Sequence, residues 1–292
     1  MMRLKLYLKN SIKPALLFNL ILIFSLFLSG CDSSIKPTYK EEDIPFLVKK
    51  ICKEEYKLDV ITKRNPTALW IYAPLQKILH NEYGIKEGKF FDEEIMEKMR
   101  NILTTVGRVL ISSDNAPEFF ALLASDINIG IDYTIISSVL DLKKSYAGFI
   151  PWTEANRRYV VRLKENSEAI NDKTGQHLIA EKIVLPDFLA EQIAGRIGSH
   201  FQGEALKGSF KVDKVDGVFE IDRFIFEYSI NQTQALKNKI DLQNEIIKIA
   251  AYCIKTYEFK DFSAVELKDL FTNEETVVGK DFIWSSPVNE RF

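Results

Sequence analysis

The side chains best suited to catalysis or metal binding are few in this 292-residue chain and lie far apart. The three histidines, His80, His177 and His200, form neither an HxxxH nor an HExxH motif. A zinc site would therefore have to combine them with the chain's cysteines or with unpatterned carboxylates. No GxSxG elbow, Walker A loop or GxGxxG loop occurs in a suitable context. The sequence predicts no metal site, no cofactor site and no catalytic residue.

Cys52 and Cys253 each fall on the apolar stripe of a predicted helix. In an oxidising compartment these two thiols could form a disulfide, provided that their Cα atoms lie within about 7 Å of each other. The alternative is a pair of buried free cysteines, which behave as small apolar side chains.

A candidate binding surface lies between residues 149 and 164. Apolar and basic side chains alternate over 157–164, which is typical of a strand with one cationic face. That face could meet anionic lipid headgroups or an acidic partner, although protection of an open sheet edge is the simpler explanation. Residues 149–152 are apolar, so they would form an interaction patch if they were exposed. The simpler expectation is that they pack in the core. The residues predicted to contact a partner are Trp152, Arg158, Arg162 and Lys164.

The N-terminus has the order of a secretory signal peptide. Basic residues at Arg3, Lys5, Lys9 and Lys13 precede an apolar run over 15–28, without an acidic residue among them. As a helix this run would rise about 21 Å, which is short of the roughly 30 Å hydrocarbon core of a bilayer. A cleaved signal is therefore favoured over a transmembrane helix.

The signal ends in Leu28-Ser29-Gly30-Cys31, which resembles the bacterial lipobox at each position. The resemblance implies that diacylglycerol is attached to the Cys31 thiol, that residues 1–30 are removed, and that the new amino group is acylated, for example by palmitate. Two or three chains make such an attachment effectively permanent, since each buried CH₂ contributes about 0.8 kcal/mol. The resemblance therefore implies a membrane-anchored, extracytoplasmic lipoprotein on the periplasmic face. Asp32 resembles the signal for retention in the inner membrane, so it favours that membrane. An uncleaved anchor, or a chance cysteine after an ordinary signal, is the alternative.

Loss of residues 1–30 lowers the number of Lys and Arg residues from 39 to 35, against 41 Asp and Glu. The mature chain then has a formal net charge of −6. Such a chain is a poor nucleic-acid binder, because the phosphate backbone would repel it. Residues 31–42 are expected to be the lipidated cysteine and a flexible tether of about 17–20 Å, which keeps the folded part close to the membrane.

Hydrophobic periodicity predicts an α+β fold for residues 43–292. The order helix, hairpin, helix, strand, strand occurs twice, which suggests a pseudo-duplicated sheet with helices on one face. Because sequence identity between the halves is negligible, a coincidence of element order is the alternative. Helices are predicted at 43–56, 92–109, 186–197 and 235–257, and strands at 57–63, 67–75, 119–125, 131–140, 157–164, 210–212, 218–228, 262–267 and 276–283.

The domain boundary is expected in a polar, exposed connector at 166–181, between a first half at 43–165 and a second half at 182–292. In the second half, Asp216-Gly217 predicts the turn of a β-hairpin. The apolar residues of 218–228 change parity near Asp222-Arg223. A β-bulge there would restore the register, and a strand buried on both faces is the competing account.

The leading functional hypothesis is a non-catalytic, lipid-anchored protein that binds a protein partner, or supports an assembly, at the cell envelope. An enzyme with a site of scattered residues is one alternative, which a deep pocket holding His177 or His200 beside a carboxylate would favour. A carrier of an apolar ligand is another, which an enclosed apolar cavity of several hundred Å³ would favour.

Overall fold

The computed structural model describes residues 38–79, 91–203, 206, 208–234 and 240–287. The predicted signal peptide, Cys31, Asp32 and His80 lie outside the described residues, as do residues 235–239 at the start of a predicted helix. The part of the chain from Thr38 onward forms one compact unit. Among the described helices, none has the length and hydropathy needed to cross a bilayer.

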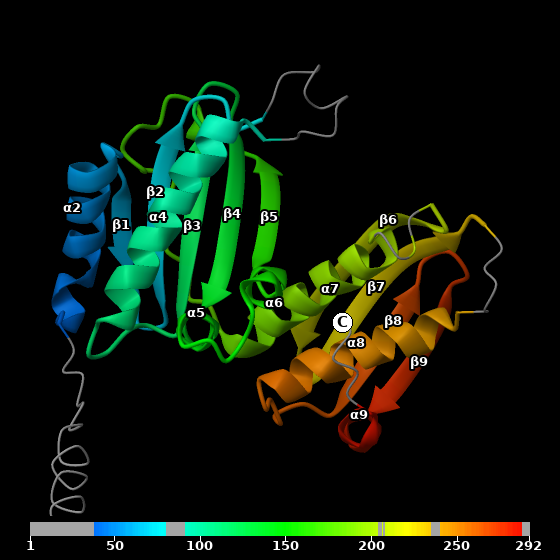
Figure 1. The fold of residues 1–292 in the computed structure, drawn as a ribbon. Helices are drawn as coiled ribbons and strands as arrows, with labels where there is room; N and C mark the ends of the chain where they lie inside the picture. Colours follow the sequence, from blue (N-terminus) through cyan, green and yellow to red (C-terminus); the bar gives the residue numbers. More distant parts are fainter. Residues whose placement is uncertain (1–37, 80–90, 204–205, 207, 235–239, 288–292) are drawn as a thin grey trace, which may run out of the picture. The chain divides into compact units, whose positions relative to one another are not determined.

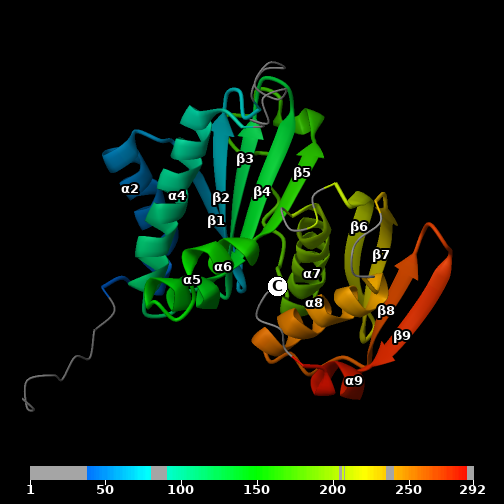
Figure 2. The same cartoon turned by 45° about the vertical axis from the view of Figure 1, so that its right-hand side comes forward.

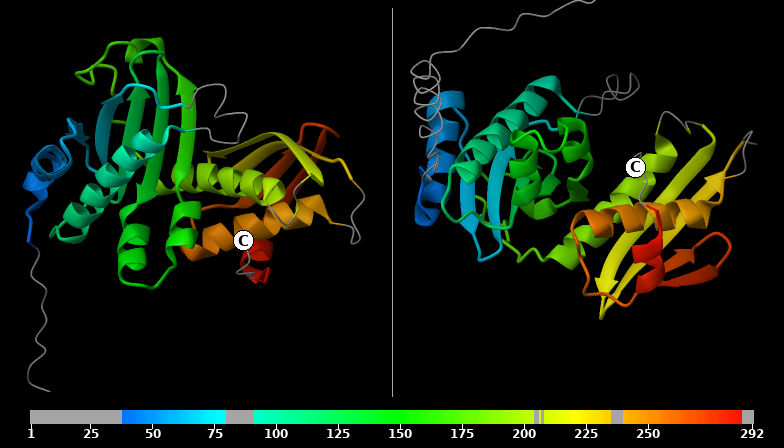
Figure 3. Two further views of the ribbon diagram at one scale, coloured as in Figure 1. Left: turned by 45° about the horizontal axis from the view of Figure 1, so that its top comes forward. Right: turned by 60° about the horizontal axis from the view of Figure 1, so that its bottom comes forward.

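The first half is a five-stranded sheet, sheet 1, in the order β1-β2-β3-β4-β5 (Figure 1). The α4 helix connects β2 to β3, which are parallel, and the other neighbouring strands are antiparallel. α2 and α4 cover one face of the sheet (Figure 3). The elements are η1 (Glu41–Asp43), α2 (Ile44–Tyr56), β1 (Ile61–Arg64), β2 (Ala68–Leu75), α4 (Glu93–Ile111), β3 (Phe119–Asp126), β4 (Ile131–Ser138), α5 (Val139–Tyr146), α6 (Trp152–Arg157), β5 (Val160–Glu165) and η2 (Ser167–Ala169).

The second half is a four-stranded sheet, sheet 2, in the order β6-β7-β8-β9. Its middle strands are parallel and connected by α8, and the outer pairs are antiparallel. α7 and α8 pack on one face of this sheet (Figure 2). Along β7 the residues that face these helices are buried, and they alternate with partly buried ones. The elements are α7 (Leu185–Gln202), β6 (Phe210–Glu220), β7 (Arg223–Gln232), α8 (Leu242–Thr256), β8 (Ala264–Asp269), β9 (Glu274–Gly279) and α9 (Lys280–Ser285).

The α+β class and the repeated order of elements are confirmed. Each half runs helix, two antiparallel strands, helix, two antiparallel strands, and each joins its hairpins through a parallel pair. The repeat builds two separate sheets rather than one, with helices on one face of each. The additional segment α5-α6-β5 belongs only to the first half.

The segment 166–181, predicted as a polar connector, lies in the chain between sheet 1 and sheet 2, and many of its side chains are exposed. It lies over the second face of sheet 1, where Leu178 and Ile183 are buried in a cluster with β2 and β3. Side chains of β2 hold its backbone: Trp70 Nε1 donates to the Glu181 carbonyl at 2.9 Å, and Tyr72 Oη donates to the Asp172 carbonyl at 2.5 Å. Sheet 1 is therefore covered on both faces, which is why β3 is buried along its whole length.

The predicted hairpin turn at Asp216-Gly217 is wrong. β6 continues through these residues, and the two-residue turn is Ile221-Asp222, with Glu220 opposite Arg223. Gly217 occurs in mid-strand because β6 crosses α7 closely there: a Cβ would lie 2.4 Å from the Ala190 carbonyl oxygen. The apolar residues change parity near Asp222-Arg223 because those before and after this point belong to two paired strands, with Phe219 opposite Phe224. The β-bulge is therefore not at Asp222-Arg223, and the register shift of this hairpin lies between Val212 and Lys214.

The first described residues are docked on the protein, so the expected tether at 31–42 is too long. Tyr39 forms a β-bridge with Ser113, which follows α4. Arg64 holds η1 by donating to the Glu41 carbonyl at 3.0 Å and pairing with the Glu41 carboxylate at 2.5 Å. Only residues 32–37 then remain between Cys31 and the docked chain.

Candidate partner-binding groove

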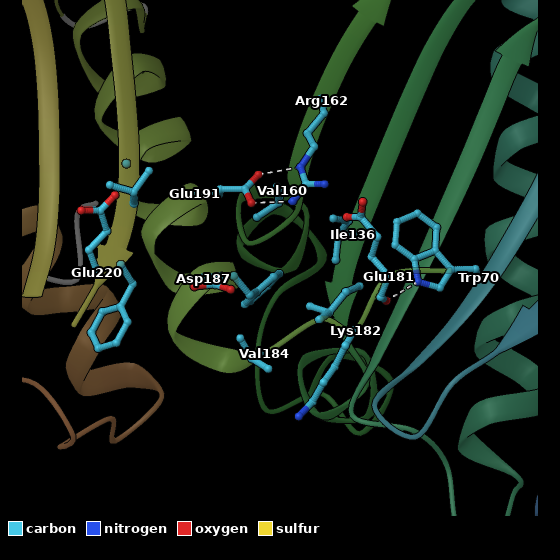
Figure 4. Close-up of a pocket in the computed structure, with 15 residues that line it drawn as sticks. Trp70, Ile136, Val160, Arg162, Glu181, Lys182, Val184, Asp187, Glu191 and Glu220 are labelled. Carbon is cyan, nitrogen blue, oxygen red and sulfur yellow. Dashed lines mark hydrogen bonds and ion pairs between the residues drawn. The ribbon is translucent and has the colours of Figure 1, made fainter. Parts of the chain in front are cut away.

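A groove separates the free edges of the two sheets. β5 is the last strand of sheet 1 and β6 the first strand of sheet 2, and among the described residues neither pairs with another strand on its outer side. α7 forms the floor between them (Figures 2 and 4). We call this depression the β5–β6 groove.

The groove consists of two adjoining pockets of about 370 and 590 Å³. They meet at the Arg162–Glu191 ion pair, which joins β5 to α7 (Figure 4). Both pockets are lined by Val160, Arg162, Glu191, Gly217, Val218 and Glu220. Their apolar surface comes mainly from Ile136, Val160, Ile183, Val184, Phe188, Val215, Val218 and Phe219.

Close packing of α7 fixes the walls of the groove. Phe188 at its N-terminal end is buried, with its ring centroid 5.0 Å from that of Phe119 in β3. One turn further, Gln192 Nε2 donates to the Arg158 carbonyl at 2.7 Å, just before β5 begins. On the other side Gly217 permits the close approach of β6 to the helix. The floor is thus attached to both sheets.

Carboxylates dominate the charge of the groove. Its lining contains Glu181, Asp187, Glu191, Asp216, Glu220 and Glu227, and only Arg162 and Lys182 as cations. Lys214, beside the groove, lies 2.8 Å from Asp216 and 3.5 Å from Glu227. The groove therefore keeps a surplus of negative charge and would attract a cationic ligand.

Electrostatic effects on pKa agree with this crowding of acids. Burial and the Glu191 charge raise the pKa of Asp187, with Arg162 opposing them. The guanidinium of Arg162 donates to both carboxylate oxygens of Glu191, at 2.7 and 2.5 Å, which raises the pKa of Arg162. Asp187 therefore gains a proton at a higher pH than an ordinary aspartate does.

The structure separates the residues predicted to contact a partner. Arg162 lies in the groove and Lys164 is exposed further along β5. Trp152 is 48% exposed on α6, and Phe149 before it is 80% exposed. The expectation that 149–152 packs in the core is therefore wrong. Arg158 is only 5% exposed, so it cannot contact a partner.

Arg158 belongs instead to a buried ionic cluster that the sequence did not reveal. Its guanidinium lies 2.7 Å from Asp141 of α5 and 2.9 Å from Glu154 of α6. Glu154 also pairs with Arg196 of α7 at 2.9 Å, and Tyr257 after α8 donates to Asp141. The cluster joins helices of the first half to helices of the second. The i,i+4 spacing of Glu154 and Arg158 was its only signal in the sequence.

The charges in this cluster are mutually stabilised. Burial alone would raise the pKa of Glu154, but hydrogen bonds from Arg196 and Arg158 outweigh it and lower that pKa. Burial opposes the charge of Arg158 as well, yet Glu154 and Asp141 raise its pKa. Glu154 and Arg158 therefore stay ionised, and each depends on its partners.

His177 lies beside carboxylates, but the geometry does not form a catalytic site. Its Nδ1 is 2.6 Å from Asp172 and its Nε2 is 3.4 Å from Ser125 Oγ, in the order of a Ser-His-Asp triad. The Ser125 hydroxyl is fully buried and donates to Asp132, so it can neither reach a substrate nor give its proton to His177. The cluster attaches the connector to sheet 1.

The other candidate residues do not come together either. Burial lowers the pKa of His200, which lies 4.0 Å from Glu245. Cys52 and Cys253 are free thiols buried in the separate cores of the two halves, which is the alternative to the possible disulfide. Within the described residues no group of three or more His, Cys, Asp and Glu side chains could hold a metal ion.

A carrier of an apolar ligand would need a more apolar cavity than those observed. The pocket of about 790 Å³ beside the start of α4 is lined by charged residues as well as by Ile95 and Ile102. Those charged residues are Lys57, Asp59, Lys77, Asp92, Glu94, Lys98 and Lys173. This lining suits ions and water better than a lipid or another apolar molecule.

Comparisons with known proteins give no relationship for this chain. No protein-family model matches it, and no curated protein does. A solved structure described as "Crystal structure of Sex pheromone staph-cAM373 precursor" aligns over 82% of this chain and 81% of its own, at 12% sequence identity. The TM-score of that alignment is 0.18, so this chain's resemblance to it carries no argument about fold or function.

Proposed function

We propose that this protein is a lipid-anchored, extracytoplasmic binding protein that holds an extended, basic polypeptide segment in the β5–β6 groove. The anchor is the acylated Cys31 expected from the lipobox. The observation that carries the binding proposal is the pair of free strand edges that face one groove with an acidic and apolar lining.

A free strand edge offers unpaired backbone N–H and C=O groups to an incoming strand. Addition of a strand gives affinity through main-chain hydrogen bonds, and the alternating side chains give specificity. The six residues of β6 that line the groove, Val215–Glu220, would match an extended segment of about 20 Å. Basic side chains on both edge strands, Arg162 and Lys214 among them, discourage pairing between copies of the chain.

The lining of the groove selects the sequence of the segment. Carboxylates along α7 and β6 favour lysine and arginine on one face of the ligand. Apolar side chains from β4, β5, β6 and the connector favour valine or isoleucine on the other. The expected ligand therefore alternates basic and β-branched residues.

Binding of a labelled hexapeptide tests this proposal. An alternating Lys-Val peptide should bind the chain from residue 32 onward, and a Glu-Val peptide should not. The double variant Asp187→Asn, Glu220→Gln should weaken binding about tenfold, whereas Glu275→Gln on the exposed end of β9 should leave it unchanged. Lower pH should weaken binding as Asp187, whose pKa is raised, gains a proton. Equal binding of the two peptides, or equal affinity of all variants, would contradict the proposal.

The anchor is tested separately by mass spectrometry of the mature polypeptide. We expect an N-terminus at residue 31 whose mass includes diacylglycerol and an additional acyl chain. Cys31→Ser should release the protein from the membrane fraction. An unmodified sulfur at position 31, or an intact N-terminus, would remove the anchor but leave the peptide-binding proposal standing.

A further inference from the structure

An exposed apolar patch lies on the short helices α5 and α6. Phe149, in the turn between them, is 80% exposed, and Leu140 and Tyr146 of α5 and Trp152 of α6 are 55%, 44% and 48% exposed. The rings of Tyr146 and Trp152 contact each other, with centroids 4.9 Å apart. We call these four residues the aromatic patch. Large exposed apolar side chains gathered in this way mark an interaction site.

Cations accompany the aromatic patch. Lys143 and Lys144 of α5 and Arg157 of α6 form no ion pair with another described residue. The acidic residues of the same helices are turned into the protein, since Asp141 and Glu154 are taken up by the buried ionic cluster. The patch therefore combines aromatic rings with net positive charge, as surfaces that bind anionic membranes do.

The patch lies close to the point where the chain enters the folded part. The Tyr146 ring packs against Gly107 of α4, within 3.0–3.4 Å of where a Cβ would lie. The Thr38 N–H donates to the Ser112 carbonyl at 2.8 Å, and Ser112, which caps the C-terminus of α4, is five residues or about 7.5 Å beyond Gly107. Figure 1 shows α5 at the end of sheet 1 where the described chain begins. Residues 32–37 can span at most about 25 Å from Cys31 to this point.

We infer that the aromatic patch is a membrane-contacting face, which seats Phe149 and Trp152 among the headgroups of an anionic phospholipid surface. The inference rests on the proposed anchor at Cys31, because the short tether keeps α5 and α6 near the bilayer. Aromatic rings are favoured at the membrane–water interface, and Lys143, Lys144 and Arg157 pair with lipid phosphates. A second contact beside the anchor fixes the orientation of the protein, and hence of the β5–β6 groove, on the membrane.

Quenching of tryptophan fluorescence by brominated lipids tests this face directly. Residues 32–292, which include the whole compact unit, are attached through an N-terminal hexahistidine to vesicles of phosphatidylglycerol and brominated phosphatidylcholine containing a nickel-chelating lipid. The metal tether replaces the acyl chains, so the result does not depend on modification of Cys31. We expect a loss of tryptophan emission relative to vesicles without bromine. The loss should disappear in Trp152→Phe, which keeps the buried Trp70 and the partly buried Trp284.

Two further variants separate the contributions of the patch. Phe149→Ser should reduce the quenching of Trp152, and the triple variant Lys143→Gln, Lys144→Gln, Arg157→Gln should reduce it on anionic vesicles more than on neutral ones. Phe271→Ser, at an exposed position between β8 and β9, is the matched control and should change nothing. Absence of quenching in the tethered wild-type protein, or equal quenching in Trp152→Phe, would overturn the inference and leave the patch to a protein partner.

Discussion

At the scale of single residues, Gly217 shows how close backbone packing determines a residue type. It lies in the middle of β6, where a Cβ would be 2.4 Å from the Ala190 carbonyl oxygen and 2.8 Å from the Phe226 ring. Gly198 of α7 is different, because a Cβ there would meet no atom within 4 Å. The two glycines therefore respond oppositely to the same substitution.

We expect Gly217→Ala to destabilise the protein by about 1–3 kcal/mol, since α7 or β6 must move to admit the methyl group. Gly198→Ala should stabilise it by about 0.5–1 kcal/mol, because alanine has the higher helix propensity. Urea denaturation of both variants measures the difference. Similar free energies of unfolding for the two variants would show that β6 does not depend on this close approach.

Asp172 provides a prediction on pH. Burial alone would raise its pKa, but the backbone N–H groups of His177 and Thr174 and their side chains outweigh it and lower that pKa well below the usual range. A carboxylate with a lowered pKa stabilises the folded state above its unfolded pKa of about 3.9, and this stabilisation is lost as the pH falls further. Asp172→Asn should therefore lower stability at pH 7 and reduce the loss of stability between about pH 4 and pH 2. Thermal denaturation at a series of pH values measures this, and an unchanged acid limb would contradict it.

At the scale of elements, the connector at 166–181 is held in part by hydrogen bonds from side chains of β2. Tyr72→Phe removes the donor to the Asp172 carbonyl, at a cost of about 1 kcal/mol. We expect faster hydrogen exchange in residues 171–181, while exchange in α8, which packs on the other sheet, remains unchanged. Equal exchange in the variant and the wild type would show that the Tyr72 hydrogen bond does not help to hold the connector.

The elements whose pattern depends on local sequence could be predicted. The Asp92 cap of α4 and the apolar stripes of α2, α7 and α8 are properties of neighbouring residues. α2, α4 and α7 begin within one residue of the expected positions, whereas α8 begins at Leu242 rather than at residue 235. The β6–β7 turn could not be predicted in the same way. The Asp216-Gly217 pair is typical of a turn, but glycine is required at position 217 because β6 passes close to α7 there. α7 lies many residues earlier in the chain, so no local pattern indicates this contact.

The candidate site was predicted only in part, for the same reason. An alternating strand at 157–164 indicated an edge strand with basic residues, and β5 is at the edge of sheet 1. The rest of the groove comes from α7 and β6, which no local pattern brings to β5. Arg158 and Arg162 are arginines of the same alternating basic segment, so the local sequence does not distinguish them. Arg158 is buried because Asp141 and Glu154 lie beside it in the folded protein.

At the scale of the whole molecule, the buried ionic cluster should control how the halves unfold. Arg158→Met leaves Asp141 and Glu154 with less compensation in a buried site, so we expect a loss of about 3–5 kcal/mol. Arg108→Met, which breaks an exposed pair with Glu55, is the matched control and should cost at most about 1 kcal/mol. In calorimetry the first variant should also broaden or split the unfolding transition, because each half has its own core. A single sharp transition at the wild-type temperature would contradict this role for Arg158.

The two free cysteines have a consequence for measurements on the native protein. Cys52 is buried in the core of the first half and Cys253 in that of the second, and burial raises the pKa of both thiols. A thiol-specific reagent can therefore modify each one only when its own half opens. The two labelling rates, separated by peptide mapping of a single unmodified sample, would report the local opening free energies of the halves side by side.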